Sequence, residues 1–172
     1  MLRAADLPAG YTDIDPVSIG LSKEKINAGI FKVESLFALS NPQNGEFIYG
    51  GTTHLANLVD IWAFDAALDR RDALTTAFTL AMSTKKIVEV RDLPGSDKIG
   101  DRSAGDAILA SSSSGEVWVD IIAFRRGNNG ALLMVQRYEG AIPVISTLDI
   151  ARKFDARIVE ILNSGTISGA HN

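Results

Sequence analysis

The sequence contains no cysteine among its 172 residues. Without thiolates the chain cannot form disulfides, zinc–thiolate sites or iron–sulfur clusters, and a cysteine nucleophile is excluded. Histidine is almost as scarce, because only His54 and His171 are present. The sequence contains no histidine pair at metal-ligand spacing, no Walker motif and no glycine-rich phosphate loop. We therefore expect neither a metal site nor a cofactor.

A clustered positive surface and a long apolar run are also missing. The net charge is −4, from 17 basic and 21 acidic residues, and the densest basic groups are single pairs such as Lys85–Lys86. Nucleic-acid binding needs clustered positive charge, so it is disfavoured. No apolar run approaches the roughly 20 residues of a transmembrane helix, and the start lacks the apolar segment of an export signal. The chain is then either cytoplasmic or an exported domain whose signal has been removed.

The composition indicates one globular domain. Hydrophobic residues make up 46% of the chain and charged residues 22%, both ordinary values for a folded protein. A chain of this length buries enough surface to fold without disulfide or metal support. We predict an extended lead-in over residues 1–21, a single domain over 22–162 and a flexible tail over 163–172.

Apolar periodicity and turn residues predict an α+β fold. Ser22 is a candidate N-cap for a short helix over 23–29, and Asn44–Gly45 predicts the turn of a hairpin between strands 31–39 and 46–51. Residues 55–64 fit neither the helical nor the strand period. From Asp69, a cap or first-turn acid, apolar residues recur at helical spacing through Met82. The remaining expected elements are strands over 86–93, 103–111, 116–126 and 131–138, and a helix over 146–162.

This order of elements favours a mostly antiparallel sheet of about six strands packed by helices. The first strands form a hairpin, and the last four form a meander. Six apolar residues of the lead-in are expected to pin it to the core: Leu7, Tyr11, Ile14, Val17, Ile19 and Leu21.

Few residues form a catalytic pattern. His54 is a possible general base, and the segment from Gly100 to Gly105 contains Asp101 and Ser103, which would complete a hydrolase site. The segment fails the Gly-x-Ser-x-Gly pattern of a nucleophile elbow, and a tight turn in which Asp101 bonds nearby backbone is favoured over catalysis. Ser22 to Lys25 matches Ser-x-x-Lys, but a capped helix explains it without catalysis.

Two charged pairs have a binding interpretation and a simpler one. Arg125 and Arg126 end the most apolar strand, where they would hold an anionic ligand. We favour a solvated hairpin end, in which the two charges keep the strand edge from pairing with another chain. Asp65 and Asp69 are four residues apart, a spacing that allows a shared helix face and a hard cation. A negatively charged helix start is the favoured interpretation.

Four segments together resemble uncharacterised bacterial domains, many of them lipoprotein-like. They are Leu7-Pro8-Ala9-Gly10-Tyr11, Ile99 to Ser103, Phe124-Arg125-Arg126-Gly127, and the basic helix from Leu148 to Arg157. The resemblance spans most of the chain and implies no activity or catalytic residue. The arrangement also resembles the PsbP-like fold, an α/β/α sandwich whose members are often accessory or binding proteins outside the cytoplasm. This chain departs from the pattern because it has no lipid-attachment cysteine.

We therefore expect a non-enzymatic accessory or binding domain with an unknown protein or small molecule as partner. If an export signal has been removed, the domain is the soluble part of an exported protein. The alternative is a carrier of a small apolar ligand between sheet and helices. A hydrolase around His54, Asp101 and Ser103 is the third hypothesis. The candidate ligand-binding residues are Trp62, Trp118, Arg125 and Arg126, and the sequence indicates no oligomeric state.

Overall fold

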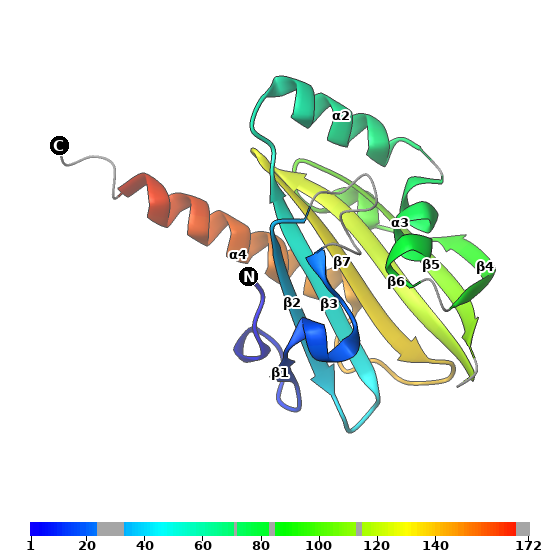
Figure 1. Cartoon of the computed structure of the whole chain (residues 1–172). Helices are drawn as coiled ribbons and strands as arrows, with labels where there is room; N and C mark the ends of the chain where they lie inside the picture. The colour runs from blue at the N-terminus through cyan, green and yellow to red at the C-terminus, as the bar shows by residue number, and fades with distance from the viewer. Residues whose placement is uncertain (24–32, 71, 83–84, 113–114, 168–172) are drawn as a thin grey trace.

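The chain folds into one antiparallel sheet with helices on both faces (Figure 1). A computed structural model describes residues 1–23, 33–70, 72–82, 85–112 and 115–167. The strands are β1 Thr12–Ile14, β2 Ser35–Asn41, β3 Glu46–His54, β4 Lys86–Asp92, β5 Arg102–Ser112, β6 Gly115–Arg126 and β7 Asn129–Tyr138. The helices are α2 Leu58–Leu68, α3 Ala73–Ala81 and α4 Thr147–Ile167, with short 3-10 turns η1 Ala4–Asp6, η2 Pro16–Ile19 and η3 Ser96–Lys98.

The strand order is β1-β2-β3-β7-β6-β5-β4, and every neighbouring pair is antiparallel. The α+β class and the antiparallel sheet are thereby confirmed. The sheet has seven strands rather than about six, because the lead-in adds β1 at one edge, where Thr12 pairs with Ser40. Hydrogen bonding to an existing edge needs backbone groups rather than an apolar pattern. This seventh strand therefore left little signal in the sequence.

The predicted hairpin and meander are both present. Gly45 adopts a φ of +68°, and its N–H donates to the carbonyl of Asn41 at 2.9 Å, so the turn joins β2 to β3 where expected. The four strands β4 to β7 run in sequence order across the sheet. The final strand β7 then inserts beside β3, with Ile48 opposite Val135, and closes the two halves into one sheet.

One face of the sheet is covered by α4. The helix buries Ile150, Phe154 and Ile158, and the Phe154 ring makes edge contacts with Phe37 at 5.0 Å and Phe124 at 5.6 Å between centroids. This is the apolar stripe that the helical periodicity predicts. The helix continues to Ile167, beyond the expected end at residue 162, so part of the predicted tail is helical. Residues 168–172 lie outside the described residues.

The opposite face is covered by α2 and α3. Phe64 and Leu68 of α2 and Leu74 and Phe78 of α3 are buried against the sheet. The ambiguous segment 55–64 therefore begins a helix. The expected role of Asp69 as a helix-starting acid is wrong, because Asp69 is the C-cap of α2. The chain forms two short helices there instead of one.

The lead-in packs against both layers only in part. Tyr11 and Leu21 are buried, as expected, whereas Val17 and Ile19 are exposed. Leu2, which the pattern did not single out, is buried beside α4. The expected helix over 23–29 lies outside the described residues, apart from its first position. Strand β2 begins at Ser35, four residues later than predicted.

Candidate functional site

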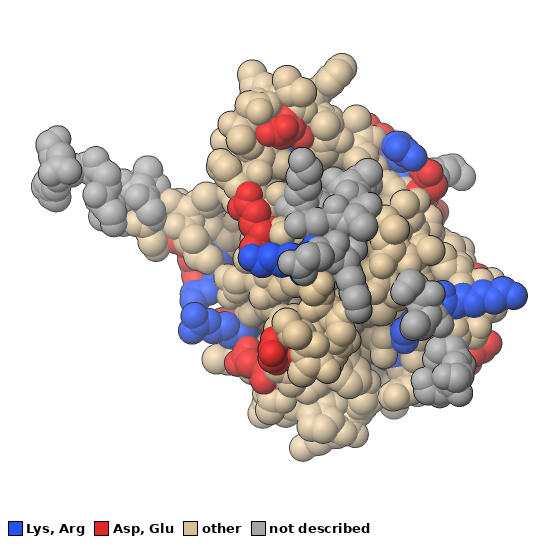
Figure 2. All heavy atoms as spheres, in the orientation of Figure 1, with Lys and Arg blue, Asp and Glu red and all other residues tan. Residues whose placement is uncertain are grey.

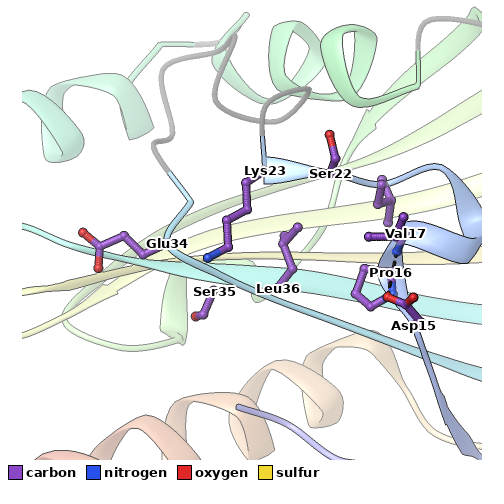
Figure 3. A pocket seen from close by; sticks show the side chains of 9 residues that line it. Asp15, Pro16, Val17, Ser22, Lys23, Glu34, Ser35 and Leu36 are labelled. Atoms are coloured by element: carbon purple, nitrogen blue, oxygen red, sulfur yellow. Dashed lines mark hydrogen bonds between the residues drawn. The ribbon is translucent and has the colours of Figure 1, made fainter.

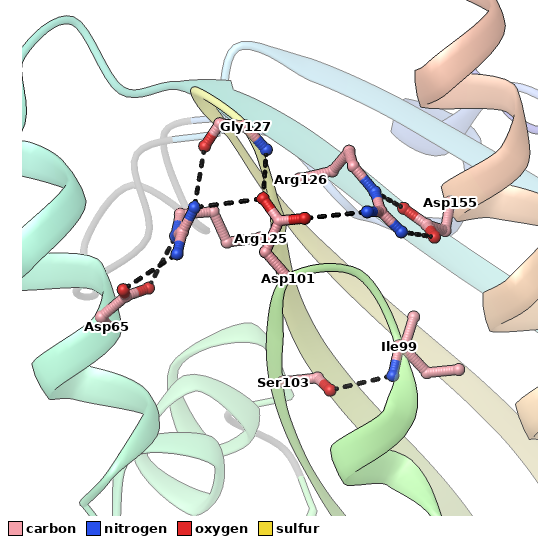
Figure 4. A network of polar contacts seen from close by, with 8 residues as sticks. All are labelled: Asp65, Ile99, Asp101, Ser103, Arg125, Arg126, Gly127 and Asp155. Atoms are coloured by element: carbon pink, nitrogen blue, oxygen red, sulfur yellow. Dashed lines mark hydrogen bonds and ion pairs between the residues drawn. The ribbon is translucent and has the colours of Figure 1, made fainter.

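Charged residues at one end of the sheet form a clamp between the two helical layers (Figure 4). Arg125 donates from Nε and Nη2 to the carboxylate of Asp65 on α2, at 2.8 and 3.1 Å. Arg126, which points to the other face, donates to Asp155 on α4 at 2.8 and 2.5 Å. Asp101 lies between them and accepts from Arg125 Nη1 at 3.3 Å and Arg126 Nη1 at 2.8 Å. Adjacent residues of one strand therefore hold helices on opposite faces, as strand alternation requires.

The clamp changes the interpretation of both arginines. Their strand β6 lies between β7 and β5, so the interpretation of a protected strand edge is wrong. Hydrogen bonds to Asp65 and Asp155 raise the pKa of Arg125 and Arg126 respectively. Three carboxylates surround two guanidinium groups, and an incoming anion would meet an excess of negative charge. This arrangement favours a structural role over anion binding.

The turn from Gly100 to Ser103 is the tight turn that the sequence predicts. Asp101 accepts from the Gly127 N–H at 2.7 Å, and Ser103 Oγ accepts from the Ile99 N–H at 3.1 Å (Figure 4). His54 ends β3, with β7 and β6 between that strand and β5. At about 4.8 Å per strand, roughly 14 Å of sheet separates His54 from Ser103. Within the described ranges, no hydrogen bond links His54, Asp101 and Ser103.

The two tryptophans lie in different layers. Trp118 lies on β6 with its neighbours Val117 and Val119 facing α2 and α3, so alternation places Trp118 on the α4 face. The Arg91 guanidinium stacks 4.7 Å above its ring. Trp62 lies on α2, on the other side of the sheet. The structure thus brings Arg125 and Arg126 together but does not bring the tryptophans into one pocket.

A buried polar network lies on the α4 face and was not predicted. Glu46, at the start of β3, is 1% exposed and accepts from the Tyr11 hydroxyl and from Arg137 Nε, the latter at 2.7 Å. Arg137 also donates to Asp120 at 2.9 Å and to the Thr147 hydroxyl at 2.9 Å. These contacts join the lead-in, the sheet and the start of α4. Scattered single acids along strands carry no sequence pattern, so only the fold reveals the network.

The most unusual surface of the chain is the outer side of α2, which we call the α2 apolar surface and define by Leu58, Val59 and Trp62. These side chains are 82%, 73% and 80% exposed. In Figure 2, the surface above α2 is mostly uncharged, whereas acidic and basic residues are mixed elsewhere on the same face. Ordinary surface helices turn charged or polar residues to solvent. This helix is apolar on both sides.

The fold holds the α2 apolar surface in a fixed position. Asn57 caps the helix by accepting from the N–H groups of Val59 and Asp60 at 2.9 and 3.1 Å. Farther along α2, Asp65 is bound by Arg125, as described above. Phe64 packs over Gly130, where a Cβ would lie 2.5 Å from the ring. Cap, ion pair and close packing together present the apolar side chains on a rigid element.

The acids of α2 do not form a cation site. Asp65 and Asp69 each bind an arginine, and Asp69 accepts from Arg102 Nη2 at 2.5 and 2.6 Å. Among the described residues, no group of three or more histidine, aspartate or glutamate side chains is arranged to hold a metal ion.

No helix in the described parts of the chain is long and apolar enough to cross a membrane.

Open grooves lie beside several of the described elements. One groove of about 510 Å³ lies under α2 and includes His54, and another of about 530 Å³ lies beside β4 and β5. A third, of about 480 Å³, lies between η2 and β2 (Figure 3). The groove beside β4 and β5 contains Asp92 and Asp106, which lie opposite each other on these neighbouring strands. Burial, with the Asp92 charge, raises the pKa of Asp106.

Comparison with known proteins adds no relative. No known family profile matches the chain, and no curated protein shows significant sequence similarity to it.

Proposed function

We propose that this chain is a non-enzymatic accessory or binding domain that docks a protein partner on the α2 apolar surface. The observation that carries the proposal is the exposure of Leu58, Val59 and Trp62 on one rigid helix. Contiguous apolar surface is uncommon on soluble monomers and marks interaction sites. Tryptophan is also among the residues that contribute most to binding energy in protein interfaces.

The charges around the surface favour a protein over an anionic membrane. The acid Asp60 lies between the exposed apolar residues, and the described helix α2 contains no basic residue. Anionic lipid surfaces attract lysine and arginine and would repel this helix. A partner with an apolar groove and a basic rim would complement it.

Two features support a role without catalysis. The carboxylates and guanidinium groups at the end of the sheet bind one another, and His54 lies three strands away from Ser103. A nucleophile, a base and an orienting group would have to converge within hydrogen-bond reach. Purified protein that turns over a panel of esters, phosphates and glycosides would contradict this part of the proposal.

Site-specific photocrosslinking in the native host tests the docking surface. A benzoylphenylalanine at Val59 should give one dominant protein adduct, and the same group at Lys153, exposed on α4, should not. Adding Trp62→Ser to the Val59 variant should remove the adduct, because the partner loses its main apolar contact. The proposal fails if both positions label equally or if Trp62→Ser leaves the adduct unchanged.

We also propose that the arrangement is PsbP-like. An antiparallel sheet with helices on both faces supports this assignment. An experimental structure that superposes on PsbP-like proteins with a shared strand order would support it further, and a different connectivity would reject it. Fold alone does not specify the partner.

A further inference from the structure

The solvent-facing side of α2 carries apolar side chains of two sizes. Residues four apart form a row along a helix, so Leu58, Trp62 and Ala66 share one row. All three are exposed, and the exposed Val59 lies in the neighbouring row. The bulky side chains therefore occupy the first part of the helix. Ala66, whose side chain ends at Cβ, leaves a lower surface in the second part.

This order of sizes is self-complementary about a two-fold axis. When two copies of α2 lie antiparallel across such an axis, Leu58 and Val59 of one copy lie over Ala66 of the other. The two Trp62 rings then meet beside the axis, and each contact occurs twice, as an isologous interface requires. Large side chains packed against small ones fill the space between helices. A parallel pair would instead leave a gap where alanine meets alanine.

The same axis brings unlike charges together. Asp60, near the start of α2, is exposed, and the side chain of Arg70, just beyond the end of α2, is 60% exposed. In the antiparallel pair, Asp60 of each copy lies toward Arg70 of the other, which supplies the basic residue that α2 lacks. Arg70 binds Asp72 in its own chain, but such an exposed ion pair is worth little and leaves the guanidinium free to shift.

The available area matches a reversible dimer. Leu58, Val59 and Trp62 are 82%, 73% and 80% exposed, and a tryptophan alone buries up to about 250 Å². Together with Ala66 they would remove roughly 500 Å² of each copy from water, or about 1,000 Å² in total, which is at the lower limit of specific interfaces. We therefore expect association at micromolar concentration rather than a permanent complex.

We infer that the partner of the α2 apolar surface is a second copy of this chain, bound through an antiparallel pair of α2 helices. This inference rests on the proposed docking function and names its partner. In Figure 1, α2 lies along one outer end of the molecule, with the sheet on its inner side. Because two identical surfaces meet, the assembly closes at two copies.

Introduced cysteines test the geometry, because the chain has none of its own. Val59→Cys and Ala66→Cys chains, one of them carrying an affinity tag, should form a mixed disulfide dimer when they are combined and oxidised. Each variant alone should crosslink far less, because identical positions of the antiparallel pair lie about 10 Å apart along the axis. Crosslinking of each variant with itself as strong as the mixed reaction would overturn the inference.

Sedimentation equilibrium of the purified whole chain measures the association. The wild type should show a reversible monomer–dimer equilibrium, and Trp62→Ser should raise the dissociation constant about thirtyfold or more. Ile142→Ser removes a side chain that is 85% exposed on the loop after β7, and this control should dimerise as the wild type does. A wild type that stays monomeric up to about 1 mM, or a folded Trp62→Ser that dimerises equally well, would overturn the inference.

The photocrosslink at Val59 in the native host separates this inference from the docking proposal. An adduct with the mass of two copies of the chain supports both. If the purified chain is monomeric and the adduct contains a different protein, the second copy is rejected and the docking surface stands. If the purified chain is monomeric and Val59 gives no specific adduct, both are rejected.

Discussion

Removal of Glu46 from the buried network should be one of the most damaging single substitutions in this chain. Glu46→Ala deletes an almost fully buried carboxylate and leaves Arg137 Nε and the Tyr11 hydroxyl without their acceptor. Loss of one partner from a buried ion pair costs about 3–5 kcal/mol. Arg137 keeps Asp120 as a second carboxylate, so we expect the lower end of that range, about 3 kcal/mol. For a domain of this size, that loss lowers the melting temperature by about 6–12 °C.

Urea unfolding followed by tryptophan fluorescence and circular dichroism measures this loss directly. Asp72→Ala, which removes an acid from an exposed ion pair with Arg70, should leave the midpoint nearly unchanged. The double variant Glu46→Ala/Tyr11→Phe should cost less than the sum of the two single variants, because the Tyr11 hydroxyl has already lost its acceptor. A cost below about 1 kcal/mol for Glu46→Ala would refute the reasoning from burial.

Three further substitutions test other parts of the structure. Burial, with the Asp92 charge, raises the pKa of Asp106 in the folded chain above its ordinary value of 3.8. Because the buried carboxylate must then ionise, the folded state loses stability relative to the unfolded state as the pH rises above that value. Asp106→Asn should therefore raise the melting temperature at about pH 7 and give no gain near pH 3. Gly100→Ala places a Cβ 2.3 Å from the Arg125 carbonyl oxygen at positive φ, whereas Gly127→Ala at similar φ meets nothing within 4 Å. Chemical denaturation should show a larger loss for Gly100→Ala, and equal losses would reject the steric explanation. Asp101→Ala should cost about 1–3 kcal/mol, because it unlinks both arginines and the Gly127 N–H; unchanged stability would show that the clamp contributes nothing.

The ambiguity of residues 55–64 had a physical cause. Helical periodicity is recognised when apolar residues occupy one face and polar residues the other. In α2, Phe64 and Leu68 face the sheet while Leu58, Val59 and Trp62 face solvent. The same excess of apolar residues that obscured the helix is the signal of the candidate docking surface. A helix that fits no amphipathic period is itself a reason to look for a partner.

For Arg125 and Arg126, the interpretation of a protected strand edge is wrong because β6 is an interior strand, and ligand binding stays a prediction. Their pairing at a strand end indicated a ligand or a protected edge, but their partners in the fold lie 24 to 60 positions away in the sequence. Local sequence does not reveal such distant pairing.

Local patterns in the sequence were enough to predict the α+β class, the hairpin, the four-strand meander and the apolar stripe of α4. Each of these follows from local patterns: turn chemistry, alternation with period two, and recurrence at three and four residues. Tertiary structure alone decided the insertion of β7 beside β3, the pairing of β1 at the edge, the clamp across the sheet and the exposure of α2. These features depend on contacts between segments that are distant in the sequence. Backbone hydrogen bonds between strands and the pairing of buried opposite charges select the arrangement there.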